Sequence, residues 1–180
     1  MTKLRWLLLL TQMPASASSA RVALWRRLKA AGATSVEHGA WVLPASKVHK
    51  MLLEELAQTV QAQGGSASLF EATAIANDDE MIARFASDRQ REYQEFATRA
   101  QGVLNEVAKE IAAKKFTFAE LEEVEDDLKK LEVWLGKIAA RDFFAGDALT
   151  TAQEQLGACV RAVESFAASV YVADGVAGRD

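Results

Sequence analysis

The sequence predicts an α+β protein in which a ferredoxin-like βαββαβ unit is followed by an antiparallel helical bundle. Over residues 1–76, short apolar runs of strand length alternate with two amphipathic helical segments. From residue 77 onward, the apolar residues recur only with helical spacing. We therefore expect two domains: 1–76, the ferredoxin-like unit, and 77–180, a three-helix bundle or a long helical hairpin plus one helix.

The elements of the first domain follow from apolar runs and from turn and cap residues. His38-Gly39 is a two-residue turn of the kind that closes a hairpin. In order, we expect a strand at 4–10, a helix from Ser18 or Ser19 to Gly32, strands at 33–37 and 40–44, a helix from Ser46 to Gly64-Gly65 and a strand at 68–76. The buried helix faces are expected to carry Ala20, Leu24, Leu28 and Ala31, and then Met51, Leu52, Leu56 and Val60. Both helices are expected on one face of the sheet.

The second domain begins with an Asn77-x-x-Glu80 capping signature, and Thr117-x-x-Glu120 caps the next helix. Its helical apolar stripes are Ile82, Phe85, Tyr93, Phe96, Ala100, Val103, Val107 and Ile111; then Leu121, Val124, Leu128, Leu131, Leu135 and Ile138; then Leu156, Cys159, Val163, Phe166 and Val170. Short connections between long helices favour antiparallel neighbours.

Each of the first two stripes contains one charged residue at a seam position. If the helical hairpin turns around Phe116, Arg89 meets Asp142, and an ion pair between them is the natural solution because an unpaired buried charge is costly. Arg84, Arg91 and Arg141 lie one helical step away, so this level is a candidate anion pocket. In the alternative interpretation, Arg89 extends to the surface and Asp142 ends a helix.

Composition excludes several classes of protein. The chain has 180 residues, 50% of them hydrophobic and 26% charged, which is ordinary for a globular protein. No apolar run approaches the roughly 18 residues that span a bilayer, so we expect no membrane partner. One cysteine and two histidines predict no disulfide framework and no histidine-rich metal site. No phosphate loop, dinucleotide fingerprint or nucleophile elbow occurs, so we expect no cofactor, no metal, no catalytic residues and no enzyme activity.

The first residues leave two interpretations open. A basic start, an apolar run and Ala15-Ser-Ala17 imitate a secretory signal peptide, but the run from Trp6 to Leu10 is shorter than the roughly seven to fifteen residues of a signal core. We therefore favour a first core strand and a cytoplasmic protein.

Charge is distributed unevenly along the chain. The formal net charge of −4 divides into +4 over residues 1–76 and −8 over residues 77–180. Four cations, Arg21, Arg26, Arg27 and Lys29, gather on the first predicted helix, where they are candidate DNA phosphate ligands. Alternatively, they form an ordinary solvated helix face.

Specific motifs run through most of the chain: Arg5-Trp-Leu-Leu-Leu-Leu10, Trp25-Arg-Arg-Leu-Lys29, Gly39-Ala-Trp-Val-Leu-Pro44, Arg91-Glu-Tyr-Gln-Glu-Phe96, Phe116-Thr-Phe118 and Arg141-Asp-Phe-Phe144. In these motifs the sequence resembles the N-terminal region of ChrB chromate-resistance proteins, a likeness that implies a chromate-responsive transcriptional regulator. The chain ends at residue 180, where such regulators continue into a second chromate-resistance domain, so we expect a stand-alone homologue or a truncated regulator.

The first domain also resembles the ferredoxin-like module of PaaX-type repressors and of small CRISPR-associated nucleases. Those nucleases place an Asp at the end of the first strand, where this chain has Thr11-Gln12. Nuclease activity is therefore not carried over.

Two functions follow as expectations. The leading one is a DNA-associated regulator of the ChrB type. The alternative is an oxyanion-responsive or partner-binding accessory protein, with chromate or another oxyanion as ligand and a homodimer formed through a sheet edge.

Overall fold

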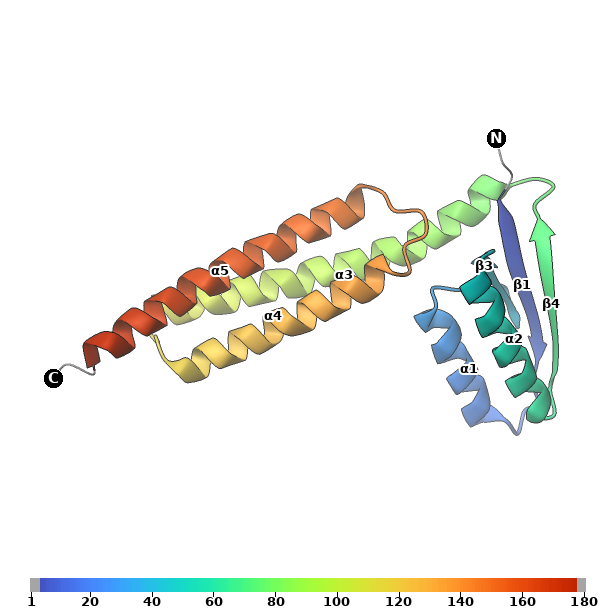
Figure 1. The fold of residues 1–180 in the computed structure, drawn as a ribbon, viewed down its shortest axis with the longest axis horizontal. Coiled ribbons are helices and arrows are strands. Elements are labelled where there is room, and N and C mark those ends of the chain that lie inside the picture. Colours follow the sequence, from blue (N-terminus) through green and yellow to red (C-terminus); the bar gives the residue numbers. More distant parts are fainter. Residues whose placement is uncertain (1–3, 178–180) are drawn as a thin grey trace. The chain divides into compact units, whose positions relative to one another are not determined.

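The structure, a computed structural model, describes residues 4–177. Within this range the elements are, in order, β1 (Arg5–Gln12), α1 (Ser18–Ala30), β2 (Thr34–Glu37), β3 (Ala40–Pro44), α2 (Lys47–Ala62), β4 (Ser66–Thr73), α3 (Asp78–Ala112), α4 (Phe118–Ala139) and α5 (Asp147–Ala177) (Figure 1).

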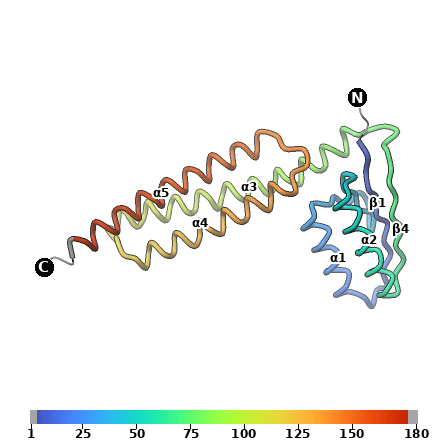
Figure 2. Tube along the Cα trace, in the orientation of Figure 1, coloured from blue at the N-terminus to red at the C-terminus, as the bar shows by residue number. Residues whose placement is uncertain are grey.

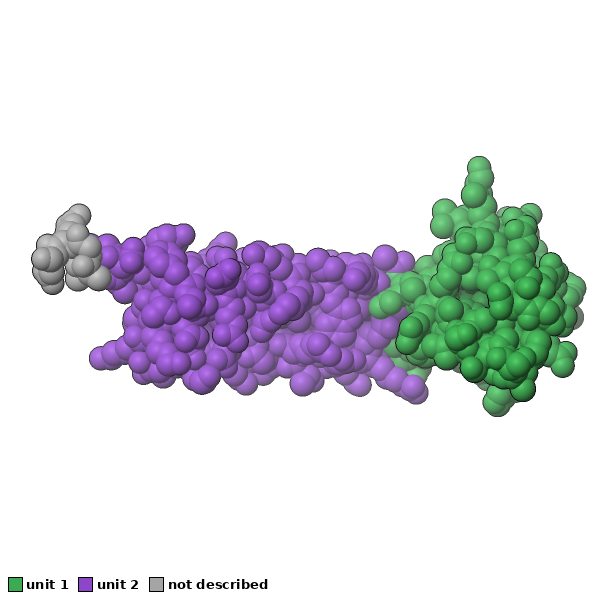
Figure 3. Space-filling model, turned by 90° about the horizontal axis from the view of Figure 1, so that it is seen from below, with its two compact units in different colours: residues 1–88, 141–144 green, residues 89–140, 145–180 purple. Residues whose placement is uncertain are grey.

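The chain divides into two compact units, coloured separately in Figure 3. The sheet unit comprises residues 1–88 and 141–144, and the helical unit comprises residues 89–140 and 145–180. The division falls inside α3, between Asp88 and Arg89.

The sheet unit contains a four-stranded antiparallel sheet with the order β2-β3-β1-β4. Strand β1 occupies the centre with β3, and β4 lies beside β1 along its whole length (Figure 2). Helices α1 and α2 cover the same face of the sheet (Figure 1). This strand order and connection confirm the predicted α+β class with a ferredoxin-like unit followed by helices.

Both faces of β1 are apolar, which explains its uninterrupted run of leucines. Leu7 and Leu9 join the core beneath α1 and α2. Trp6 lies on the opposite face, in a second cluster with Val42 and Phe85. Its ring stacks on Phe85 at a centroid separation of 5.7 Å. A strand buried on both sides shows a continuous hydrophobic run instead of alternation.

The segment 141–144 belongs to the sheet unit although it follows α4 in sequence. Phe143 packs edge-on against His49 at 5.0 Å, and Phe144 lies 5.7 Å from Phe85. His49 Nδ1 lies 2.7 Å from the carbonyl oxygen of Pro44, so the imidazole proton is placed on Nδ1. These contacts make the Phe-Phe pair part of the aromatic cluster around Trp6.

Some predicted boundaries are confirmed and others are wrong. Ser46 caps α2 through a hydrogen bond from the His49 amide, as expected. The prediction that Ser18 or Ser19 begins α1 as its cap is wrong. Ala17 occupies the N-cap position, and its side chain makes no hydrogen bond. The predicted bounds of β4, 68–76, are also wrong. The strand runs from Ser66, which pairs with Gln12 of β1, to Thr73, which pairs with Arg5.

The buried face of α2 is also shifted from the expected one. Leu53 is buried with Leu56 and Val60, whereas Met51 is exposed.

The helical unit packs α4, α5 and the greater part of α3 around one core. Its buried side chains include Phe96, Val103, Leu131, Ile138, Cys159, Phe166 and Val170. Thr117 caps α4 by accepting a hydrogen bond from the Glu120 amide, as predicted. Ile111 was expected in the core and is exposed, and Glu110, one position earlier, is buried instead.

Helix α5 is apolar along much of its length. An 18-residue window within Asp147–Gly175 has a mean hydropathy of 1.3, which by length and composition alone would suit a membrane span. Five of its side chains, Ala152, Cys159, Val163, Phe166 and Val170, are buried in the core of the helical unit.

Candidate functional site

Helix α1 carries the four cations that the sequence marks as DNA ligands. Leu24 and Leu28 bury one face of this helix against the sheet, so the opposite face is exposed to solvent. The helix ends at Ala30, and Gly32 follows its C-cap residue; the Gly32 φ of +81° lets the Gly32 and Ala33 amides donate to the carbonyls of Lys29 and Leu28.

Two of the four cations are neutralised by carboxylates within the sheet unit. Arg27 donates hydrogen bonds from Nη1 and Nη2 to the two carboxylate oxygens of Glu55 on α2, at 2.9 and 3.0 Å. This hydrogen bonding raises the pKa of Arg27 and lowers the pKa of Glu55. Lys29 Nζ lies 3.2 Å from Asp88 Oδ2. The pairs link α1 to α2 and to α3, and they reduce the charge that Arg27 and Lys29 offer to a phosphate.

The other two cations keep their charge available. Arg21 donates to the carbonyl oxygen of Ala15 at 3.0 Å, which fixes the side chain without neutralising it. Within residues 4–177, no carboxylate pairs with Arg21 or Arg26, and both side chains are exposed. Trp25, between them in sequence, leaves 51% of its surface exposed.

A groove adjoins this face of α1. It has a volume of about 590 Å³ and is lined by Arg21 and Trp25 from α1, Trp41 from β3 and His38 from the β2–β3 turn, among others. The turn is held by a hydrogen bond from the Thr11 amide to the Gly39 carbonyl at 2.7 Å. Two indoles and a guanidinium around one groove suit a flat aromatic ring that carries negative charge.

The candidate anion pocket is divided between the two units. Arg84, Arg141 and Asp142 belong to the sheet unit, and Arg89 and Arg91 belong to the helical unit. Arg84 is exposed and lies 3.5 Å from Glu80. Arg89 is buried, and its Nη1 lies 3.1 Å from Glu92 Oε2. The pairing of Arg89 with Asp142 stays a prediction, as does the pocket.

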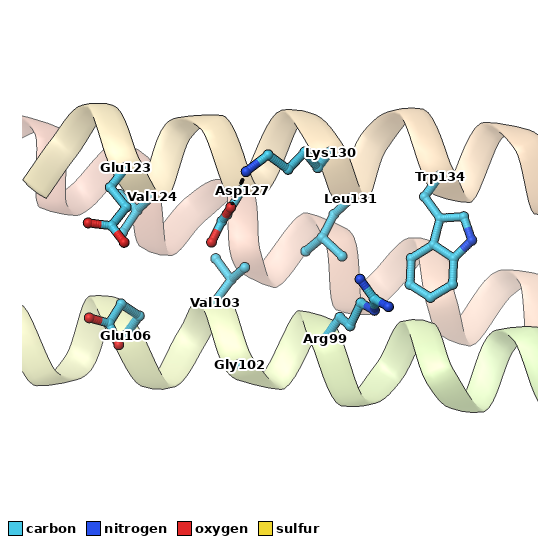
Figure 4. Close-up of a pocket in the computed structure, with 10 residues that line it drawn as sticks. All are labelled: Arg99, Gly102, Val103, Glu106, Glu123, Val124, Asp127, Lys130, Leu131 and Trp134. Carbon is cyan, nitrogen blue, oxygen red and sulfur yellow. Dashed lines mark hydrogen bonds and ion pairs between the residues drawn. The ribbon is translucent and has the colours of Figure 1, made fainter.

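A second groove, of about 550 Å³, lies between α3 and α4 in the helical unit (Figure 4). Glu106 and Glu123 face each other at one end of it, and Arg99 lies over the Trp134 ring at the other, 4.9 Å from its centroid. Its charged groups largely pair locally: Asp127 with Lys130 at 2.8 Å, and Arg99 with Glu95 at 2.8 Å. The groove therefore has little uncompensated charge to offer a ligand.

Sequence reasoning missed the buried carboxylate of Glu110. Its Oε1 lies 3.2 Å from Lys109 Nζ, and its Oε2 lies 3.3 Å from Lys115 Nζ. Burial raises the pKa of Glu110, but hydrogen bonds from both lysines outweigh it, so the net pKa lies below the ordinary value. The signal in the sequence was an acidic residue at helical spacing from Val103 and Val107, with a lysine before it and Lys114-Lys115 shortly after it.

The fold and the site together define an α+β protein with a tryptophan-bearing cationic helix on a ferredoxin-like sheet. A family model described as "Protein ChrB, N-terminal" matches residues 21–176. The chain therefore belongs to the ChrB N-terminal family, in agreement with the motifs noted above. Protein ChrB of Cupriavidus metallidurans is 36% identical over 91 residues, which are 51% of this chain and 28% of that protein. The match thus spans less than a third of that relative.

Proposed function

We propose that this chain is a regulatory protein associated with chromate resistance and that it binds DNA through α1. Membership of the ChrB family supports the association with chromate resistance. The observation that carries DNA binding is that Arg21 and Arg26 are exposed, share α1 with the exposed indole of Trp25 and have no carboxylate partner among residues 4–177.

The chemistry of this face suits a nucleic acid. Guanidinium groups that contact phosphates release condensed counterions, which provides affinity and makes it depend on salt. Such contacts position a protein on DNA without reading its sequence. The Trp25 ring adds an apolar surface for a sugar or a base. Arg27 and Lys29 contribute less, because binding a phosphate would require them to leave Glu55 and Asp88.

A salt series with point variants tests this proposal. The probe is a labelled duplex from the region upstream of the gene that encodes this chain, and binding is followed by fluorescence anisotropy. The double variant Arg21→Gln/Arg26→Gln is expected to bind more weakly, with the slope of log K against log salt reduced by about 0.9 for each lost phosphate contact.

Arg27→Gln is the matched control, because it removes one cation from the same helix at a position paired with Glu55. It should change the slope little. Equal losses in Arg27→Gln and in the double variant would show that helix stability, and not phosphate contact, controls binding. Absence of binding by the wild-type chain at low salt would overturn the proposal.

One observation favours the alternative, an oxyanion-responsive protein. The Nε and Nη1 groups of Arg89 are buried and, among the described residues, lack a hydrogen bond of good geometry. Nη1 lies within ion-pair distance of Glu92, so Nε is the donor that could turn to a tetrahedral oxyanion. Thermal stabilisation by chromate or sulfate that disappears in Arg89→Gln, while Arg99→Gln, an exposed position on α3 outside the candidate pocket, retains it, would support this function. An unchanged melting temperature with either anion would count against it.

A further inference from the structure

The two edges of the sheet differ in how far they resist pairing with another strand. Strand β2 has four residues, and its register with β3 shifts between Ser35 and Glu37. Short length and a bulge both protect an edge. Strand β4 has eight residues, all of which pair with β1 in continuous register. It contains no Pro or Lys, and it ends the sheet within residues 4–177.

The side chains of β4 make this edge more attractive to a partner. Phe70 pairs with Leu8, so it lies on the face opposite α1 and α2, and half of its surface is exposed. Leu10 lies on the same face, where 40% of its surface is exposed. The one charged residue of the strand, Glu71, is paired with Arg5 of β1 at 2.8 Å. The edge thus presents unpaired backbone groups, a large apolar ring and a neutralised charge.

We propose that the partner of this edge is a second copy of the chain, with the two β4 strands antiparallel across a two-fold axis at Phe70. An axis perpendicular to the sheet keeps α1 and α2 of both copies on one side, and it joins the two sheets into one of eight strands. The unpaired edge selects an extended strand as its partner, because only a strand satisfies a row of N–H and C=O groups.

The position of the two-fold axis decides which residues of the two β4 strands lie opposite each other, and these side chains determine the register. An axis at Phe70 places the two Phe70 rings directly opposite and sets Ser68 against Ala72, so that small residues flank the rings. Glu71 then faces Leu69. An axis at Glu71 would place two carboxylates directly opposite each other, which is destabilising. A strand that meets its own copy without a charge conflict and with an aromatic pair at the axis is self-complementary.

The first test measures the mass of the full chain by light scattering over a range of concentrations. The wild-type chain is expected to reach twice its mass of 19.6 kDa. Phe70→Lys places two ammonium groups opposite each other at the axis, so the mass should fall to 19.6 kDa. Phe118→Lys is the matched control, because that phenylalanine is similarly exposed but lies on α4.

The second test uses cross-linking and does not require the lysine variant to fold. Directly opposite residues of antiparallel strands lie about 4.5–5.5 Å apart at Cα, within the roughly 4.4–6.8 Å of a disulfide. Phe70→Cys is therefore expected to form a covalent dimer under mild oxidation. Met51→Cys, an exposed position on α2, should stay monomeric, and the buried Cys159 should not contribute in either variant.

Three results would overturn the inference: a wild-type mass of 19.6 kDa at every concentration, a dimer that survives Phe70→Lys, or equal cross-linking of the two cysteine variants. The first would leave a different polypeptide strand as the partner of β4, and the other two would place the dimer interface elsewhere. The outcome is separate from DNA binding, which is measured on α1.

Discussion

Gly32 shows how one residue connects two distant segments of the sheet unit. Its φ of +81° favours glycine, and it turns the chain just after the C-terminal end of α1. A Cβ atom built there would lie 3.0 Å from Arg141 Cβ and 3.1 Å from Phe143 Cε2. The residue is therefore needed both for the backbone turn and for the close approach of residues 141–144.

Gly32→Ala is expected to destabilise the protein by about 1–3 kcal/mol, because the strained backbone and the crowded Cβ act together. The measurement is the free energy of unfolding in urea. Gly102→Ala is the control, since a Cβ there meets no atom within 4 Å in the middle of a helix. That variant should be stabilised by up to about 1 kcal/mol. Similar effects of the two variants would contradict the packing argument at Gly32.

Cys159 is expected to be chemically inert in the native protein. It is buried, its Sγ donates to the Ala100 carbonyl oxygen at 3.4 Å, and burial raises the pKa of its thiol. A thiol that is neither exposed nor ionised reacts slowly. Treatment with a thiol reagent at neutral pH should leave the native chain unmodified and label one site after unfolding. Rapid labelling of the folded chain would contradict the buried placement.

The sequence identified the cations of α1 but not which of them are free. Arg27 pairs with Glu55, 28 positions away, and Lys29 pairs with Asp88, 59 positions away. Such partners depend on how the helices pack, which no local pattern reports. The groove beside Trp25 was missed for the same reason, since its lining comes from α1, β1, β3 and a turn.

At the scale of elements, the sequence predicted helix starts correctly where the stabilising hydrogen bond joins residues close in sequence. Ser46 and Thr117 cap helices because a hydroxyl can reach an amide three residues on. The bounds of β4 are set by its pairing with β1, which the apolar alternation of its own residues does not report. The predicted strand therefore started and ended too late in the sequence. The core face at the end of α3 was shifted by one residue, because the two lysines near Glu110 allow a carboxylate where an apolar residue was expected.

Glu110, near the C-terminal end of α3, should make the stability of the protein depend on pH. Its pKa is lower in the folded protein than the roughly 4.3 of an unfolded chain, so its ionised form favours folding. That contribution is complete above the unfolded pKa and is lost as pH falls through the folded pKa.

Glu110→Gln should therefore be less stable than the wild type at neutral pH, and the difference should close in acid. Urea unfolding between neutral and acidic pH measures this difference. Glu122→Gln, on an exposed part of α4, is the control and should show no such gap. A gap that persists in acid would mean that packing, and not charge, makes Glu110 important.

At the scale of the whole molecule, the order of elements sufficed to predict the fold class, because the βαββαβ connection restricts the sheet to few topologies. The sequence did not reveal that residues 141–144 join the sheet unit. Phe143 and Phe144 continue an apolar pattern that fits a bundle equally well. Only their contacts with His49, Phe85 and Trp6 assign them to the aromatic cluster.

The composition of α5 raises the question of whether the chain associates with membranes. Its apolar side chains have an alternative role, because Cys159, Val163, Phe166 and Val170 fill the core of the helical unit. Inserting α5 into a bilayer would remove these side chains from α3 and α4. It would also move Arg161 and Glu164 toward hydrocarbon, at roughly 2.5–3.5 kcal/mol for a charge at the bilayer centre.

We therefore predict that the folded chain does not bind lipid. In flotation with neutral and with anionic phospholipid vesicles, the wild-type protein should stay with the unbound fraction, and its unfolding midpoint should not change. The variant Phe166→Asp places a carboxylate in the core of the helical unit and should destabilise the packing of α5. Flotation of this variant tests whether α5 binds lipid once it leaves the core. Flotation of the wild-type protein with the vesicles would contradict the prediction. It would show that α5 leaves the core without a destabilising substitution and that its apolar side chains contact lipid.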